Sequence, residues 1–197
     1  MPVVDEITLS LVEREYERGL KKEVELELWV GKELMSESLV SIAESLRRVS
    51  RGKIKYKAVE GKGFFPAVRI LKNLLYMGVP TGLQFGVFTH FLLDLSRKRF
   101  YVGDELMGKI RGVKRDVEIL VFTTPGCPHS PQQVRWVYEF AAINSKISAR
   151  VIDVGMFPKA ALRYAWVSKF TPSTLIDNRK VIRGVASPDE ILRKISE

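Results

Sequence analysis

The sequence of 197 residues contains an internal repeat, and this repeat constrains the fold more than any other feature. Val30 and Phe122 close the first apolar strand of each copy and lie 92 residues apart. Further along the chain, Pro66 and Pro172 are separated by 106 residues. The spacing therefore grows by about the length of a helix within one copy. The first copy is predicted to lack a helix that the second copy carries within residues 155–170.

Alternating and helical hydrophobic patterns predict the same order of elements in both copies. In the first copy we expect helices over residues 5–20, 38–49 and 83–95, strands over 24–30 and 53–59, and a hairpin of 68–71 with 74–77. In the second copy we expect strands over 117–122 and 147–154, helices over 132–143 and 160–166, a hairpin of 174–176 with 180–183, and a final helix after Ser187. A linking helix is expected over 103–111. The chain is thus predicted to be an α/β protein of two units, residues 1–112 and 113–197.

The composition excludes several classes of protein. Apolar residues make up 46% of the chain, and no apolar run approaches the ~20 residues of a membrane span. Cys127 is the only cysteine, and His90 and His129 are the only histidines. An internal disulfide is therefore excluded, and neither a metal site nor an organic cofactor is expected. Residues 1–15 are acidic and amphipathic, unlike a signal peptide, so we expect a cytoplasmic location.

The net charge of +9 is spread along the chain. There are 19 basic and 15 acidic residues up to Gly112, and 13 basic and 8 acidic residues after it. Because no basic cluster or nucleic-acid motif stands out, nucleic acid is not the favoured partner. Only six residues are Asn or Gln, while Lys, Arg, Glu, Val and Ile are common, a bias typical of a thermophile's protein.

The most informative segment is Thr124-Pro125-Gly126-Cys127-Pro128-His129-Ser130, which lies between a buried strand and a helix. We expect the sulfur of Cys127 at the N-terminus of that helix, where free backbone N–H groups and the helix dipole stabilise a thiolate. Pro128 suits the first helical turn, because the N–H that it lacks would have no partner there. A protonated His129 would add a nearby positive charge. Each effect favours a nucleophilic Cys127; the alternative is an inert, buried cysteine.

This segment resembles the active-site motif of the thioredoxin superfamily. In architecture the chain is most similar to the protein disulfide oxidoreductases of hyperthermophiles, which consist of two fused thioredoxin- or glutaredoxin-like units. The resemblance implies two tandem thioredoxin-like units, each a mixed four-stranded sheet flanked by helices, with the first unit truncated. It also implies a cis-proline facing the cysteine. Thr171-Pro172 fits that position, 45 residues after Cys127, and Phe65-Pro66 occupies the matching place in the first unit.

The sequence departs from this family in the residues that carry its two-thiol chemistry. Ser130 stands where the family has its second cysteine. The first unit has no cysteine, and Glu33, Leu34 or Met35 occupies the matching position. The usual cycle, which closes an internal disulfide, therefore cannot run in this chain alone. Cys127 could still attack a disulfide, but the mixed disulfide would have to be resolved by glutathione, another small thiol or a protein partner.

Two functions follow as hypotheses. The first is a monothiol thiol–disulfide oxidoreductase or isomerase that acts on protein or peptide disulfides through Cys127, with Thr171 and Pro172 holding an extended substrate chain. The second is a non-catalytic protein-interaction module on a retired thioredoxin-like scaffold. An iron–sulfur cluster shared between two chains, as in monothiol glutaredoxins, is a more distant alternative, and a homo-oligomer is left open.

Several residues near the motif allow two interpretations. Ser130 is either a hydrogen-bond donor to the sulfur or a neutral relic. Pro172 either positions the substrate or only sets the angle of its strand. His129 either modulates the pKa of the thiol or is an exposed side chain without consequence. Phe64 and Phe65 form either part of the core or an exposed patch for a partner, and the pattern favours the core.

Overall fold

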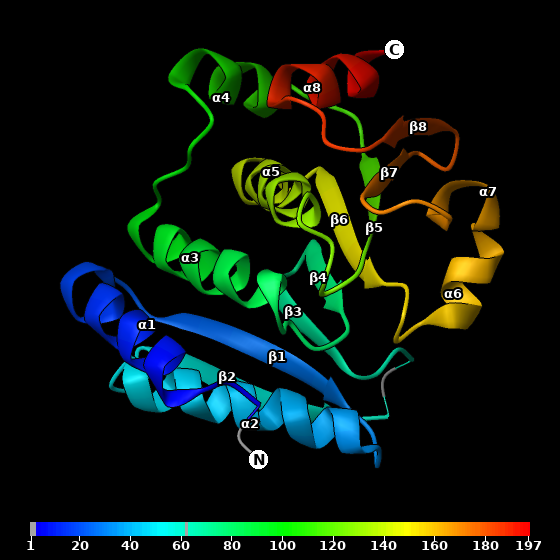
Figure 1. Cartoon of the computed structure of the whole chain (residues 1–197). Coiled ribbons are helices and arrows are strands. Elements are labelled where there is room, and N and C mark those ends of the chain that lie inside the picture. Colours follow the sequence, from blue (N-terminus) through cyan, green and yellow to red (C-terminus); the bar gives the residue numbers. More distant parts are fainter. Residues whose placement is uncertain (1–2, 62) are drawn as a thin grey trace.

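The computed structural model describes residues 3–61 and 63–197, which form one molecule built on a single sheet (Figure 1). Within the described residues the sheet has eight strands in the order β2-β1-β3-β4-β6-β5-β7-β8. The four strands of the first sequence copy lie side by side, and the four strands of the second copy continue the same sheet. The two mixed four-stranded sheets implied by the resemblance are therefore joined edge to edge.

The first unit pairs its strands in the expected mixed pattern. Its strands are β1 (Val24–Val30), β2 (Ile54–Glu60), β3 (Ala67–Leu71) and β4 (Leu74–Met77). Its helices are α1 (Glu6–Gly19), α2 (Leu34–Val49), α3 (Leu83–Arg97) and α4 (Asp104–Arg111). Strand β1 runs parallel to β2 and antiparallel to β3, and β3 is antiparallel to β4. The predicted boundary at residues 112 and 113 falls in the loop after α4 and stays a prediction.

The second unit repeats this pattern. Its strands are β5 (Val117–Thr123), β6 (Ile147–Asp153), β7 (Ser173–Ile176) and β8 (Lys180–Arg183). Its helices are α5 (Ser130–Ile143), α6 (Pro158–Arg163), α7 (Ala165–Ser168) and α8 (Pro188–Ser196). Strand β5 runs parallel to β6 and antiparallel to β7, and β7 is antiparallel to β8. Helix α8 starts where its capping signal predicts, because the side chain of Ser187 accepts the Glu190 N–H at 3.2 Å.

The truncation of the first unit is visible in the connection between β2 and β3. Residues 61 and 63–66 join these strands without a helix, whereas α6 and α7 lie between β6 and β7. Two expected boundaries were wrong. Helix α2 begins at Leu34 rather than near residue 38, and the single helix expected over 160–166 is divided into α6 and α7 at Tyr164.

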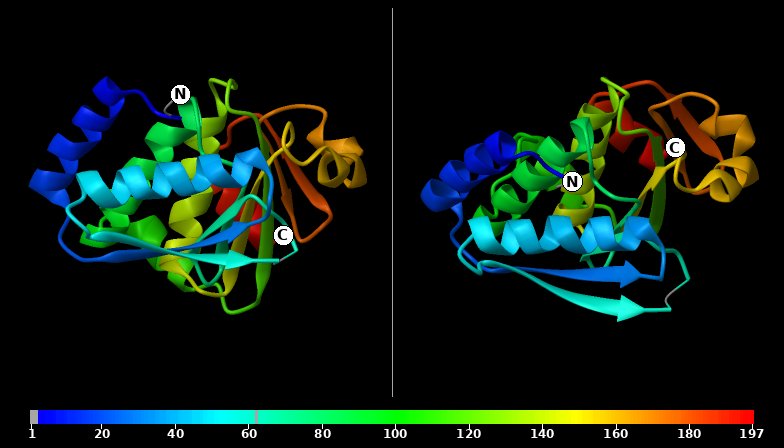
Figure 2. Two further views of the ribbon diagram at one scale, coloured as in Figure 1. Left: turned by 90° about the horizontal axis from the view of Figure 1, so that it is seen from below. Right: turned by 60° about the horizontal axis from the view of Figure 1, so that its bottom comes forward.

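The alternation of side chains along the strands divides the core between the two faces of the sheet. Ile119 and Val121 of β5 point to the larger cluster, which includes side chains of α1 to α5 and α8. Leu120 and Phe122 point to a smaller cluster with α6 and α7. Figure 2 shows α2 lying over one face of β1 and β2, with no helix on the other face. The missing helix has thus left part of one sheet face open.

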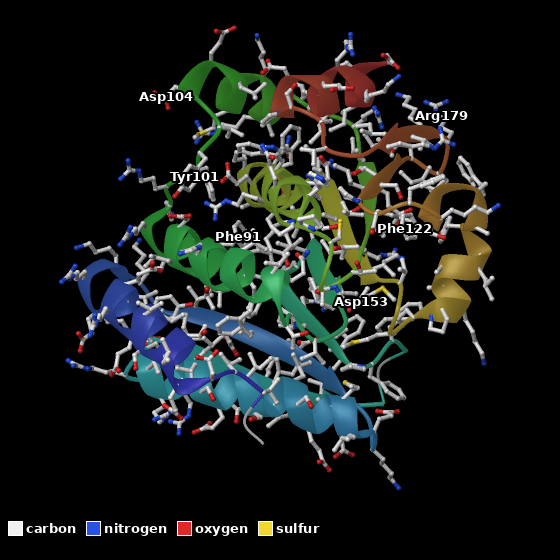
Figure 3. All side chains as sticks on the ribbon, viewed as in Figure 1. Phe91, Tyr101, Asp104, Phe122, Asp153 and Arg179 are labelled. Atoms are coloured by element: carbon white, nitrogen blue, oxygen red, sulfur yellow. The ribbon has the colours of Figure 1, made fainter. Side chains whose placement is uncertain are left out.

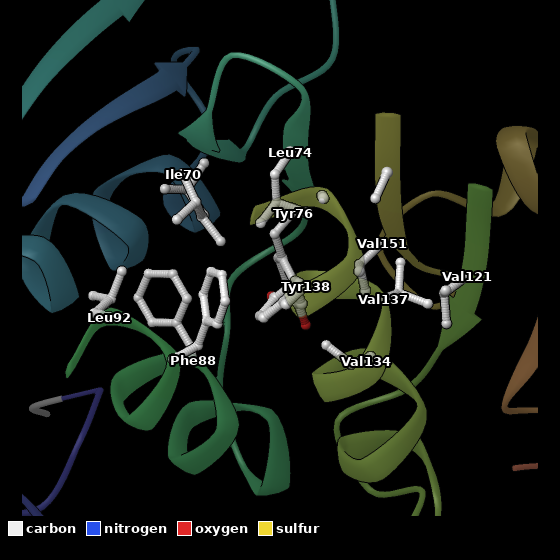
Figure 4. Close-up of a cluster of buried hydrophobic side chains, with 14 of the residues drawn as sticks. Ile70, Leu74, Tyr76, Phe88, Leu92, Val121, Val134, Val137, Tyr138 and Val151 are labelled. Atoms are coloured by element: carbon white, nitrogen blue, oxygen red, sulfur yellow. The ribbon is translucent and has the colours of Figure 1, made fainter. Parts of the chain in front are cut away.

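The two units meet at the parallel pair of β4 and β6, where Leu74 to Met77 lie opposite Ala149 to Ile152. Tyr76 and Tyr138 lie between the apolar side chains of the two halves in the close-up of the core (Figure 4). The ring of Tyr138 also packs against Phe91 of α3, with 4.8 Å between the centroids. These contacts continue the core across the junction. None of the described helices combines the length and apolar character needed to cross a membrane.

Candidate active site

The loop between β5 and α5 holds Cys127 in a tight turn. The Cys127 N–H donates to the carbonyl of Thr124 at 3.2 Å, and the Ser130 N–H donates to the carbonyl of Cys127 at 3.3 Å. Helix α5 therefore begins at Ser130, three residues after the cysteine. The expectation that Pro128 lies in the first helical turn was wrong, because this turn comes before the helix. Pro131 occupies the first turn instead.

The sulfur of Cys127 faces the backbone just before a cis-proline. The peptide bond between Thr171 and Pro172 is cis, as the resemblance implied, and so is the bond between Phe65 and Pro66. The thiol donates to the carbonyl oxygen of Thr171 at 3.2 Å. Cys127 is partly exposed, so the sulfur is neither sealed in the core nor free in solvent. The structure therefore brings three of the predicted site residues together: Cys127, Thr171 and Pro172.

The surroundings of the sulfur favour the thiolate. Burial raises the pKa of the Cys127 thiol. The side chains of Ser130 and Thr171 lower this pKa as hydrogen-bond donors, and so do the backbone N–H groups of His129 and Ser130. Together these donors outweigh burial, and the pKa lies below its ordinary value.

The hydroxyl group of Ser130 is placed to donate a hydrogen bond to the thiolate. Its side chain is fully buried, and its Oγ makes no well-aligned hydrogen bond to any described residue. A buried hydroxyl without a partner is costly, so its proton is available to the sulfur when the thiol ionises. His129 is exposed and contributes its backbone N–H. The predicted effect of its imidazole stays a prediction.

The first unit supports the loop that carries Cys127. The Leu83 N–H, at the start of α3, donates to the carbonyl of Pro125 at 3.2 Å. A Cβ on the neighbouring Gly82 would lie 3.0 Å from the same carbonyl oxygen. The buried amide of Gln84 donates to Thr123 Oγ1 at 3.0 Å. The sequence signal for this contact is Gly82, at the start of α3. Its φ of 54° is a conformation that glycine adopts more easily than other residues.

A buried carboxylate lies at the neighbouring strand end, and the sequence analysis missed it. Asp153 ends β6, opposite Thr123, and Figure 3 shows it near the end of the sheet that also carries Phe122. Its Oδ1 accepts the backbone N–H groups of Gly155 and Met156 at 2.9 and 3.2 Å, while its Oδ2 is buried without a partner among the described residues. The available signal was an Asp at the end of an apolar strand.

The described residues contain no group of three or more His, Cys, Asp or Glu side chains placed to hold a metal ion. The side chains that donate hydrogen bonds to the sulfur are the hydroxyl groups of Ser130 and Thr171, and they stabilise a thiolate. Such a thiolate can attack a disulfide and form a mixed disulfide, which is the chemistry that the loop geometry supports.

Comparisons with known proteins agree with this fold. Residues 116–196 match the family model described as the thioredoxin domain. No curated protein matches the sequence. A protein disulfide oxidoreductase from Aeropyrum pernix has 17% sequence identity and a TM-score of 0.87, with 96% of this chain and 90% of that chain covered. The N-terminal domain of the alkylhydroperoxide reductase AhpF from Enterococcus faecalis has 18% identity and a TM-score of 0.86, with 96% and 98% covered.

These comparisons confirm the resemblance to the thioredoxin superfamily. Residues 116–196 match the thioredoxin domain, and the whole chain shares the fold of the Aeropyrum pernix protein.

Proposed function

We propose that the protein is a monothiol thiol–disulfide oxidoreductase or isomerase that acts on protein or peptide disulfides through Cys127. The observation that carries the proposal is the partly exposed thiol of lowered pKa, 3.2 Å from the carbonyl that precedes cis-Pro172. A retired cysteine has no need of hydrogen-bond donors that stabilise its ionised form. The fold of the Aeropyrum pernix protein, which is named as a protein disulfide oxidoreductase, supports the same class of reaction.

The reaction begins with attack by the Cys127 thiolate on one sulfur of a substrate disulfide. A mixed disulfide forms, the substrate disulfide breaks, and the second substrate sulfur leaves as a thiolate that takes a proton from water. No second cysteine exists in the chain to resolve this intermediate. Another thiol of the substrate resolves it with no net oxidation, which is isomerisation. Alternatively, a small thiol such as glutathione attacks it, and two thiol molecules are oxidised as the substrate disulfide is reduced.

The substrate chain would lie along the backbone before the cis-proline. The Thr171 carbonyl faces the sulfur, and Phe170, directly before it, is 63% exposed. An exposed aromatic side chain beside a nucleophile offers apolar contact to an unfolded or extended polypeptide. We assign Pro172 to shaping this backbone and Pro128 to the turn that presents Cys127. No metal or organic cofactor enters the proposal. A reducing cytoplasm would supply the external thiol.

The first experiment measures the rate of alkylation of the native protein by iodoacetamide against pH. We expect a midpoint below the ~8.5 of a free cysteine, and a higher midpoint with slower alkylation at pH 7 in Ser130→Ala, because a donor to the thiolate is lost. Cys127→Ala has no thiol, so it measures the background of the alkylation assay. An ordinary or raised midpoint would overturn the proposal.

The second experiment measures turnover in the presence of reduced glutathione, with a scrambled, disulfide-bonded ribonuclease as substrate. We expect Cys127→Ala to abolish isomerisation and an acid-quenched sample of the wild type to contain a mixed disulfide between Cys127 and the ribonuclease, detected by mass spectrometry. Ser130→Cys provides a matched comparison. Its second thiol should attack the mixed disulfide at Cys127, release the substrate and leave an internal disulfide between positions 127 and 130. Unchanged isomerisation in Cys127→Ala would contradict the proposal.

A second candidate function is a non-catalytic protein-interaction module. The observation that favours it is the relic site of the first unit, where Leu34 and Met35 at the start of α2 are 73% and 44% exposed in place of a cysteine. Exposed apolar side chains at this position would suit a peptide without any redox step. This reading requires that Cys127→Ser binds its partner as tightly as the wild type does and that the wild type shows no turnover.

A further inference from the structure

A hollow of about 700 Å³ lies on the open side of the sheet, at the junction of the two units. Its floor consists of Met77, Ile152 and Leu120, which come from the neighbouring strands β4, β6 and β5. One wall is the segment 63–65, which replaces the missing helix, and the opposite wall is α6 with the loop before it. These three floor residues are only 2–3% exposed, so an occupant would contact mainly the wall side chains.

A second hollow of about 320 Å³ continues along the same side. It shares Phe64 and Arg150 with the first hollow and extends over Trp29 and Leu75. We refer to the two hollows together as the open-face groove. Phe64 is 46% exposed where the hollows meet, so the expectation that it belongs to the core was wrong. Without a helix after β2, no described element covers this ring.

The groove carries basic side chains along its whole length. They are Arg69 and Lys72 in the smaller hollow, Arg150 in both, and Lys159 and Arg163 in the larger one. No acidic side chain lines either hollow in the described part of the chain. Arg69 and Arg150 have carboxylate partners, Glu27 at 3.5 Å and Glu118 at 2.8 Å.

The remaining three cations are exposed and form no ion pair with a described residue: Lys72, Lys159 and Arg163. We propose that the open-face groove binds an acidic polypeptide segment with large apolar side chains, supplied by a partner protein. The cations are distributed along both hollows, which suits several carboxylates on a chain better than the single head group of a small amphiphile. A second copy of this protein is a poor occupant, because both copies carry a net charge of +9.

The proposal does not depend on the chemistry of Cys127. None of the residues lining the groove belongs to the candidate active site. Binding in the groove can therefore be measured in the absence of any disulfide or external thiol. A loss of thiol reactivity would leave this proposal standing, and a loss of groove binding would leave the proposed redox function standing.

The test uses fluorescence anisotropy of the full chain with two labelled synthetic peptides of the same length. In one peptide Leu and Phe alternate with Glu, and in the other Lys replaces Glu at every position. We expect the acidic peptide to bind at least about tenfold more tightly. Its Kd should rise about threefold or more between ~50 and ~300 mM salt, because screening weakens the charge pairs.

Two variants locate the binding. Lys159→Glu combined with Arg163→Glu should raise the Kd of the acidic peptide about tenfold or more, and Phe64→Ser should raise it by a similar factor. All three side chains are exposed, so the fold should tolerate the changes, which thermal melting followed by circular dichroism checks. The matched control is Arg14→Glu combined with Lys22→Glu. It makes the same change of charge at two exposed positions that do not line the groove. Arg14 lies in α1, which packs on α2 and α3, and Lys22 follows that helix.

The proposal is overturned if both peptides bind alike, or if the control lowers affinity as much as the groove variants do. It is also overturned if decanoate binds the groove while the acidic peptide does not. A dimer seen by sedimentation in the wild type and lost in the groove variants would assign the groove to a second copy and would equally overturn it.

Discussion

At the scale of single residues, the argument for chemistry rests on the donors around one sulfur atom. A lone cysteine is most often an inert apolar side chain. Cys127 differs because Ser130 and two backbone N–H groups face its sulfur, while the carbonyl of Thr171 accepts the proton of the neutral thiol. The same position therefore accommodates the neutral thiol and the thiolate, and the thiolate is the form that attacks a disulfide and the form released when the mixed disulfide is resolved.

Asp153 provides a prediction for pH-dependent stability. Burial raises the pKa of its carboxyl, although the N–H groups of Met156 and Gly155 oppose this change. A carboxyl with a raised pKa in the folded state favours folding most at low pH, and this contribution is lost as the pH rises through the folded-state pKa. Asp153→Asn keeps an acceptor for both N–H groups and removes the buried charge. We expect Asp153→Asn to be more stable than the wild type at pH 8 and the difference to shrink towards pH 4.

Urea unfolding at several pH values measures this difference. Asp116→Asn is the control, since that side chain is 85% exposed and should show no comparable trend. A less stable Asp153→Asn protein at pH 8 would show that the carboxylate has a stabilising partner.

Residue-level expectations from the sequence succeeded where local chain geometry decides the outcome. The cap at Ser187 follows from a short local motif, whereas the cis bond at Pro172 was implied by the resemblance to the thioredoxin superfamily. Phe64 could not be placed in this way, because its exposure depends on a helix that is absent after β2. Asp153 was missed because a carboxylate at a strand end is usually a solvated loop residue, whereas this one is 1% exposed and lies close to Gly78 of the other unit.

At the scale of elements, the start of α3 supports the loop that holds Cys127. Gly82 has φ 54° and ψ −133°, a conformation that is strained for any residue with a side chain, and it lies against the Pro125 carbonyl. We expect Gly82→Ala to lower the free energy of unfolding by about 1–3 kcal/mol. The added Cβ should also displace the Pro125 carbonyl and change the alkylation rate of Cys127.

Urea unfolding and alkylation kinetics on the same samples test both effects. Gly86→Ala in the first turn of α3 is the matched control, because a Cβ there has no neighbour within 4 Å. Its alkylation rate should equal that of the wild type and its stability should be unchanged or slightly higher, since Ala favours helices. Equal alkylation rates in Gly82→Ala and the wild type would separate α3 from the thiol site.

The boundaries of elements show why pattern alone was insufficient. The missing helix of the first unit was predictable, because the change in repeat spacing is a property of the sequence. The start of α2 was not, since Leu34 and Met35 occupy its first turn but face solvent, so the apolar period begins only at Leu39. Helix assignment from periodicity requires that the buried face extend to the end of the helix.

At the scale of the whole molecule, the pairing of β4 with β6 makes two units one sheet. Each unit was expected to have its own sheet, since the repeat says nothing about how the copies meet. A signal was nevertheless present in the run from Leu74 to Met77, whose four side chains are all buried. Edge strands usually carry polar or charged side chains, so an uninterrupted apolar run is typical of a strand that has neighbours on both sides.

Asn73 stabilises this junction and provides the last prediction. Its side-chain amide donates to the carbonyls of Ala141 and Ile147 at 2.8 and 2.7 Å, and the backbone carbonyl of Asn73 accepts the Ala149 N–H at 2.8 Å. Asn73→Ala leaves the first two carbonyls without this donor, and we expect the free energy of unfolding to fall by about 2 kcal/mol. Lys72→Ala, an exposed neighbour in the same turn, is the control and should change the free energy of unfolding by less than about 0.5 kcal/mol.

Because the core is continuous across β4 and β6, both units should unfold together, before and after the substitution of Asn73. Trp29 fluorescence in a background with Trp136→Phe and Trp166→Phe reports on the first unit, and far-ultraviolet circular dichroism reports on the whole chain. The urea midpoints measured by the two probes should coincide. Separate midpoints in the wild type would mean that the shared sheet does not couple the two units.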